Sequence, residues 1–273
     1  MIDSHQHFWL YDPVTFEWID DSMATIRKSF YPSDLAPILK ANNVDGTVLV
    51  QVNQDETENE AFLAHAAQNE FILGTVAWVD FMSKNLKDRL DYYTQKPILK
   101  GFRHIIQAEA DGFLLQKEFL NGIGQLARYG YTYDILVKEH QLKDVLQFVR
   151  QFPNQKFVID HIAKPDIKNH SINKWSNYIS QIAQHENVYI KVSGMVTEAD
   201  YHSWKPEDIY PYLEHVLRTF GSSRIMYGSD WPVCLVAAAY EEQLAVVKSY
   251  FSKLSSTEQH AIFDQTARSF YSL

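Results

Sequence analysis

Cysteine is almost absent from this chain, which has 273 residues but a single thiol, Cys234. One cysteine excludes an intrachain disulfide and a metal site built from several thiolates, and it is typical of a reducing compartment. Positive charge is also scarce, since 25 lysines and arginines stand against 34 aspartates and glutamates and leave a formal net charge of -9. This balance argues against nucleic acid or an anionic membrane as the main partner. A small molecule is therefore the expected ligand, and the cytoplasm the expected location.

Long hydrophobic runs and domain linkers are missing as well. The longest uncharged apolar run, Val233 to Tyr240, is far shorter than the roughly 20 residues that a membrane span requires. The first residues lack the pattern of a signal peptide. No segment rich in Pro, Gly and Ser divides the chain, and no dinucleotide-binding glycine turn follows a strand, because Gly122 and Gly124 fall within a helical pattern. We expect one domain over residues 1–273, without a membrane segment.

What the sequence does contain is a regular alternation of strand and helix patterns. Eight apolar runs of strand length occur at 2–5, 44–52, 71–79, 98–106, 131–137, 156–161, 188–193 and 224–228. Amphipathic helical patterns occur at 60–69, 86–94, 119–129, 142–152, 172–185, 206–220, 240–253 and 257–271. Continuous apolar stretches are typical of parallel strands buried on both faces. The order and the length predict a single (β/α)8 TIM barrel with an extra C-terminal helix.

Two histidines, His5 and His7, end the first predicted strand. Residues spaced by two point to the same face of a strand, so both imidazoles converge on one point. Taken alone, the pair is either a metal or proton-handling pair or a half-buried strand with His at alternate positions. Because the chemistry of a TIM barrel lies at the carboxyl ends of its strands, the other strand ends bear on this choice. They carry Gln51, Arg103, His104, His161, Lys191 and Asp230.

Several of these strand ends lie within longer motifs. The motifs are Asp3–Trp9, Gly101–His104, Ile159–Pro165, Lys191–Glu198 and Tyr227–Val233, and they span the chain from end to end. In them the chain resembles the amidohydrolase superfamily, in its branch of sugar-acid lactonases and 2-pyrone-4,6-dicarboxylate lactonases. Within that branch it is most similar to the L-fucono- and L-rhamnonolactonases. The resemblance implies a hydrolase that opens a small sugar-acid lactone to the free aldonic acid.

The resemblance also implies roles for individual residues. His5, His7, His161 and Asp230 would converge at the mouth of the barrel, with Asp230 as the general base that takes a proton from water. The histidines would hold a metal ion or polarise the lactone carbonyl. The further candidates for binding substrate or its developing oxyanion are Arg103, His104, Gln51, Lys191, Trp9 and Trp231.

The metal content is open between none and one divalent ion. Two-metal members of the superfamily carry a lysine at the end of strand four and a histidine at the end of strand five. Here strand four ends in Arg103-His104 and strand five in Val137-Lys138, with His140 only in the following loop. We therefore expect no binuclear centre. A single ion, for which zinc is the favoured candidate, would be held by His5, His7, His161 and Asp230.

Two other functions fit the same motifs. One is a mononuclear zinc-dependent decarboxylase of the same superfamily, and the other is a barrel that binds a sugar acid without turning it over. A homodimer is expected by analogy alone.

Overall fold

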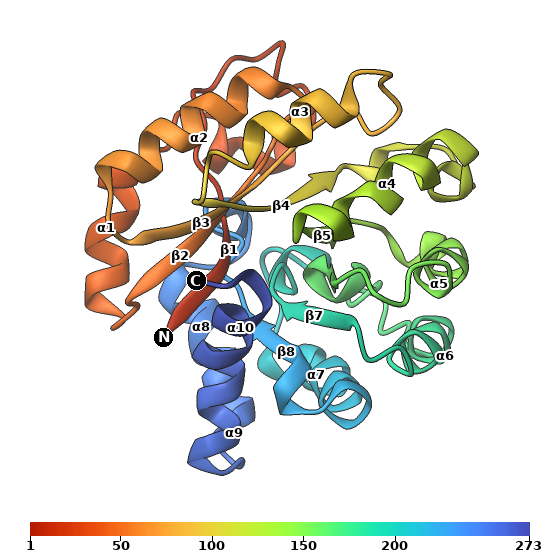
Figure 1. The fold of residues 1–273 in the computed structure, drawn as a ribbon. Coiled ribbons are helices and arrows are strands. Elements are labelled where there is room, and N and C mark those ends of the chain that lie inside the picture. Colours follow the sequence, from red (N-terminus) through yellow and green to blue (C-terminus); the bar gives the residue numbers. More distant parts are fainter.

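Eight parallel strands form one sheet, and helices surround it (Figure 1). The structure is a computed structural model that describes all residues from Met1 to Leu273. Each strand pairs with the next in sequence order, and the sheet closes because the segments after β1 and β8 meet, where the His7 N–H donates to the Trp231 carbonyl at 2.7 Å. The strands are β1 Ile2–Gln6, β2 Gly46–Val50, β3 Ile72–Ala77, β4 Leu99–His104, β5 Thr132–Ile135, β6 Phe157–Ile159, β7 Val188–Val192 and β8 Ile225–Tyr227. The predicted (β/α)8 barrel is confirmed.

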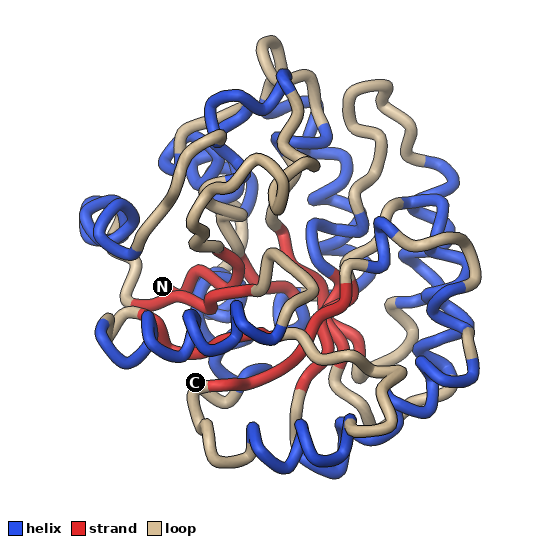
Figure 2. The backbone as a smooth tube through the Cα atoms, turned by 90° about the horizontal axis from the view of Figure 1, so that it is seen from above, coloured by secondary structure: helices blue, strands red, loops and turns tan.

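The helices form the outer layer, and loops gather beyond the strand ends (Figure 2). None of the helices is long and apolar enough to cross a lipid bilayer. Their bounds are α1 Pro32–Ala41, α2 Glu56–Gln68, α3 Leu86–Tyr93, α4 Lys117–Tyr129, α5 Leu142–Arg150, α6 Asn173–Ile182, α7 Pro206–Phe220, α8 Tyr240–Phe251, α9 Ser256–His260 and α10 Thr266–Tyr271.

Helix α1 was not predicted from the sequence. It begins with Pro32 in the first turn, where a missing N–H costs nothing, but it also contains Pro37 in its interior. An interior proline removes a helical hydrogen bond, so the sequence pattern does not indicate a helix here. Leu35 and Leu39, spaced by four, are buried against the core. This packing is what offsets the proline.

The predicted C-terminal helix is three consecutive helical segments. Helix α9 begins at the expected capping box, in which the Ser255 N–H donates to Glu258 Oε2 at 3.0 Å. A π-helical turn, Ala261–Gln265, separates it from α10. Ala267, Phe270 and Tyr271 of α10 pack against inward-facing strand residues, which include Ile2, Val48, Val50, Val76, Val158 and Met226. Helix α10 therefore covers the amino-terminal end of the barrel, and the carboxyl end is left for a site.

Candidate active site

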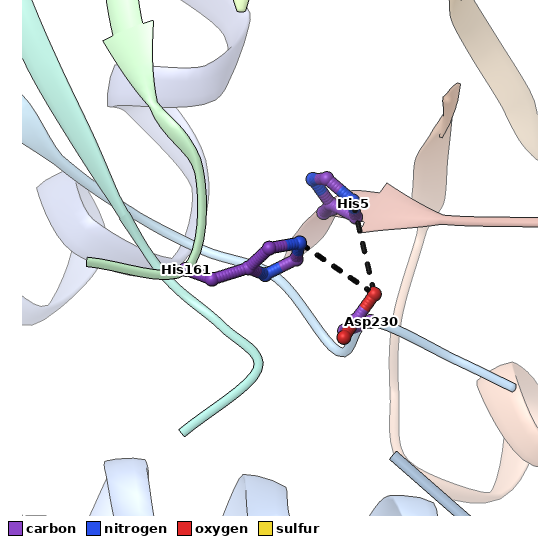
Figure 3. A group of neighbouring side chains, drawn as sticks. All are labelled: His5, His161 and Asp230. Atoms are coloured by element: carbon purple, nitrogen blue, oxygen red, sulfur yellow. Dashed lines mark ion pairs between the residues drawn. The ribbon is translucent and has the colours of Figure 1, made fainter. Parts of the chain in front are cut away.

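Four polar side chains meet at the carboxyl end of the barrel. Figure 3 shows His5 from β1, His161 from the segment after β6 and Asp230 from the segment after β8 converging on one another. Asp230 Oδ1 lies 3.8 Å from Nε2 of His5 and 3.8 Å from Nε2 of His161. Nε2 of His7, which follows β1, lies 3.3 Å from the same oxygen. One carboxylate oxygen is thus surrounded by three imidazole nitrogens.

The other ring nitrogen of each histidine has a partner. His7 Nδ1 lies 2.7 Å from the carbonyl oxygen of Val50, and His161 Nδ1 lies 2.9 Å from Ser193 Oγ. His5 Nδ1 lies 3.3 Å from Asp160 Oδ1. Such partners fix the tautomer and the ring orientation of a histidine, so that the opposite nitrogen faces the site.

Two of these nitrogens face each other as acceptors. Because His7 Nδ1 must donate to a carbonyl, a neutral His7 has its lone pair on Nε2. In the tautomer of His5 whose Nδ1–H donates to Asp160 Oδ1 at 3.3 Å, Nε2 is an acceptor as well, and Arg103 Nη1 lies 3.3 Å from it. The two Nε2 atoms are 3.2 Å apart. Two facing lone pairs repel unless a proton or a cation lies between them, so the donor set fits one divalent ion.

The charges of the group also suit a cation. Burial lowers the pKa of His161 to about 4 and that of His5 well below its ordinary value, so both imidazoles are neutral near pH 7. Burial alone would raise the pKa of Asp230, but the neighbouring imidazoles, His161 foremost, lower it below the ordinary value. Neutral imidazoles and an ionised carboxylate are the forms that bind metal ions.

A buried ion network lies beneath these residues inside the barrel. Lys191 Nζ lies 2.5 Å from Asp134 Oδ2 and 3.0 Å from Asp160 Oδ1, and all three side chains are fully buried. Arg103 Nη1 donates to Asp160 Oδ2 at 2.9 Å. Lys191 Nζ also lies 3.1 Å from His5 Nδ1. Two cations balance two carboxylates, so the network adds no net charge below the site.

The network determines which contacts the Arg103 and Lys191 side chains make. The guanidinium of Arg103 donates from Nε to Gln51 Oε1 at 3.0 Å and from Nη2 to the same oxygen at 2.9 Å. Its Nη2 also contacts the Gln51 carbonyl. Arg103 reaches the pocket, but its fork is occupied by Gln51 and Asp160. Lys191 does not line the pocket and contacts His5 from below.

A pocket of about 250 Å³ opens above the site, a size that suits a small molecule. Four of the predicted residues line it, namely His7, Arg103, His161 and Asp230. The remaining lining residues are Trp18, Val52, Ile105, Gln107, Ala108, Leu136, Lys164 and Val233.

Gln107 and Lys164 are the polar lining residues outside the predicted set. The amide oxygen of Gln107 is buried without a hydrogen-bond partner. Lys164 belongs to the Ile159–Pro165 motif, so a signal for it existed, whereas Gln107 lies in a short 3₁₀ turn after β4, Ile106–Ala108, which the sequence pattern does not mark.

Three other candidates lie outside the pocket lining. His104 Nε2 lies 2.9 Å from Glu109 Oε1, and its Nδ1 accepts from Trp78 Nε1. Trp9 Nε1 donates to the Lys28 carbonyl at 2.8 Å.

Trp231 is buried edge-on against Phe8 and Phe30. His140, weighed as a ligand of a second ion, lies at the surface 3.5 Å from Asp111.

His161 begins an unusual backbone segment. His161, Ile162, Ala163 and Lys164 have φ values of 52°, 47°, 62° and 45°, and none of them is glycine. Left-handed backbone costs roughly 1–2 kcal/mol per L-residue. Strained segments persist only where the surroundings hold them, and they gather at functional sites.

Comparisons with known proteins bear on the family of this chain. Residues 2–273 match the amidohydrolase family. The chain is 34% identical to an L-fucono-1,5-lactonase of Burkholderia multivorans over 284 residues, covering 100% of this chain and 96% of that protein. An amidohydrolase from Burkholderia multivorans solved with bound zinc superposes with a TM-score of 0.97 at 34% identity, covering 100% of this chain and 99% of the other. An L-rhamnono-gamma-lactonase of Scheffersomyces stipitis is 24% identical over 183 residues, 59% of this chain and 54% of that protein. The chain therefore belongs to the amidohydrolase family.

Proposed function

We propose that this protein hydrolyses a small sugar-acid lactone to the free aldonic acid. The observation that carries the proposal is the ionised carboxylate of Asp230, which lines a small pocket and is held among three imidazoles. The similarity to an L-fucono-1,5-lactonase along the whole chain supports a substrate of the L-fucono- or L-rhamnonolactone kind.

Asp230 is the proposed general base. Its position in the pocket lets it accept a proton from a water that attacks the lactone carbonyl. The lowered pKa keeps the carboxylate ionised but also makes it a weak base, so the water must be acidified or the carbonyl polarised. A bound divalent ion supplies both effects through its Lewis acidity. His5, His7, His161 and Asp230 would hold that ion.

The other pocket residues would orient the substrate. The free amide oxygen of Gln107 can accept a bond from a sugar hydroxyl, and the ammonium of Lys164 can donate one. Val52, Leu136 and Val233 give the pocket apolar walls. Arg103, which is held by Gln51 and Asp160, would act as a fixed positive charge near the developing oxyanion.

The test of the function is acid release from candidate lactones. Purified protein is mixed with L-fucono-1,5-lactone or L-rhamnono-1,4-lactone in weak buffer with a pH indicator, and the spontaneous rate is subtracted. We expect one proton per ring opened and a product identified as the aldonic acid by mass. Release of carbon dioxide from an unsaturated acid would instead favour the decarboxylase. Saturable calorimetric binding of an intact lactone would favour the non-catalytic barrel.

The metal proposal has a separate readout. Elemental analysis of purified protein should give at most one zinc per chain. After chelation, added zinc should raise the melting temperature of the wild type, and the rise should be much smaller for His161→Gln, which lacks one donor. Two stoichiometric ions, or an equal rise in the variant, would contradict the proposed site.

A further inference from the structure

The left-handed segment His161–Lys164 brings two pocket residues to the same wall. The Lys164 N–H donates to the His161 carbonyl at 2.8 Å, which closes a turn across the segment. With about three residues per turn, the first and fourth side chains lie on one face. Both His161 and Lys164 line the pocket. The turn thus couples the position of a proposed catalytic imidazole to that of a proposed substrate donor.

Contacts from outside the turn hold it at its middle. The indole N–H of Trp175, on α6, donates to the carbonyl of Ile162 at 2.7 Å, and both side chains are fully buried. Trp175 does not line the pocket. Its ring packs against Tyr212 and His215 of α7, so the indole is fixed by the outer helices.

Gly194 leaves room for the His161 ring at the start of the turn. Gly194 follows β7, has a φ of 60°, and a Cβ on it would lie 2.6 Å from Nδ1 of His161. Any side chain here would push the ring from its bond with Ser193. At the other end of the turn, Lys164 Nζ lies 3.3 Å from Glu198 Oε1.

We propose that Trp175 is a positioning residue, whose hydrogen bond to Ile162 holds the left-handed turn that presents His161 and Lys164 to the substrate. The consequence for activity rests on the proposed lactonase function, whereas the consequence for the His161 ring does not. Without the indole N–H, a turn of four non-glycine residues relaxes toward ordinary backbone, and both side chains leave the pocket wall.

The main test compares Trp175→Phe with Trp204→Phe. Each variant keeps a ring and deletes one indole bond to a backbone carbonyl, because Trp204 Nε1 donates to Ala237 at 2.8 Å and neither residue lines the pocket. We expect kcat/KM of Trp175→Phe to fall about tenfold or more, since a displacement of about 1 Å can cost 10²-fold. Trp204→Phe, which deletes a bond that is only part-buried, should stay within about twofold. Equal activity losses in the two variants would overturn the proposal.

A readout without turnover separates this proposal from the lactonase function. In protein labelled with ¹³C and ¹⁵N histidine, the ring signals of His161, assigned with His161→Gln, should shift or broaden in Trp175→Phe and in Gly194→Ala but not in Trp204→Phe. Unchanged signals in the first two variants would overturn the proposal even if the wild type is an active lactonase. Shifted signals in these two variants, together with a wild type that opens no lactone, would refute only the proposed function.

A rescue variant tests the strain directly. Ala163 has a φ of 62°, where glycine is free of steric cost. Ala163→Gly in the Trp175→Phe background should therefore recover part of the lost kcat/KM, although glycine ordinarily weakens a folded segment. No recovery, together with an unchanged His161 spectrum in Trp175→Phe, would show that the turn holds without the indole.

Discussion

Asp230 is placed where a general base is needed, but its lowered pKa makes it a weak base. The residue is 3% exposed, and its carboxylate lies among imidazoles that lower its pKa, so it is ionised but weakly basic. It also lines the pocket and is therefore reachable by water with the substrate. Its role can be separated from that of the histidines by changing the carboxylate alone.

Asp230→Asn should abolish most of the activity and spare the fold. The amide keeps the shape but cannot accept a proton as the carboxylate does, so kcat should fall roughly 100-fold or more. Steady-state rates on the best lactone, with circular dichroism to confirm folding, check this. A folded variant with full activity would refute the general-base role.

A separate prediction concerns the pH dependence of the free energy of unfolding that arises from His161. Its folded pKa is about 4, against an ordinary value of 6.5, because burial disfavours the charged ring. Between these values the unfolded chain binds a proton that the folded chain does not, so the free energy of unfolding falls as the pH falls. The loss from pH 7 to pH 4.5 should be about 2 kcal/mol from this residue.

The measurement is urea unfolding of the wild type and His161→Gln at both pH values, with chelator present. Other buried groups also have shifted pKa values, and they do so in both proteins. Asp3, whose pKa is raised to about 6 mainly by burial, makes the free energy of unfolding rise as the pH falls. Only the difference between the two proteins is therefore assigned to His161. Parallel losses of stability would contradict the prediction.

At the scale of single elements, helix α4 packs closely on the rest of the barrel along only one of its faces. Gly122 and Gly124 lie two residues apart in this helix. A Cβ on Gly122 would lie 2.1 Å from the backbone oxygen of Phe81, in the segment after β3. A Cβ on Gly124 would meet only a ring atom of Phe152, at an ordinary 3.5 Å.

The two alanine substitutions should therefore change stability in opposite directions. Gly122→Ala should lower the free energy of unfolding by roughly 1–3 kcal/mol, because backbone must move to admit the methyl group. Gly124→Ala should raise it by up to about 1 kcal/mol, since alanine favours the helix. Chemical denaturation of both variants checks this, and a shared sign would show that α4 does not pack on Phe81 as described.

At the scale of the whole molecule, the C-terminal helix and the site are joined through the barrel interior. The hydroxyl of Tyr271, on α10, donates to Asp134 Oδ2 at 2.7 Å. Asp134 pairs with Lys191, and Lys191 contacts His5. A side chain from the last turn of the chain thus takes part in the ion network below the active site.

Tyr271→Phe should destabilise the protein by about 1–3 kcal/mol, because a buried carboxylate loses a donor. Tyr129→Phe is the matched control, since its hydroxyl donates to Asp91 at the same 2.7 Å in an exposed position. The control should change stability by less than about 0.5 kcal/mol. Thermal and urea unfolding compare the two, and equal effects would mean that the interior bond contributes no more than a surface one.

The sequence by itself determined the features that depend on local spacing. Alternating strand and helix periods specified the barrel, the two-residue spacing of His5 and His7 placed both rings on one face, and Ser255 with Glu258 marked the start of α9. Such patterns are readable because neighbours in a strand or helix have fixed geometry. Helix α1 was not predicted because its interior Pro37 argued against a helix, although Leu35 and Leu39 have the four-residue spacing of a buried helix face.

Only the tertiary structure decided how polar groups from separate strands pair. Arg103 is held by Gln51 and Asp160, each more than 50 positions away in the chain, and these bonds occupy its guanidinium group. Lys191 lies below the pocket, whereas Gln107 and Lys164 line it. A strand-end residue type does not reveal its partner, because the partner's position depends on the closure of all eight strands. The left-handed turn at His161 has the same origin, since no local preference produces it and distant contacts hold it.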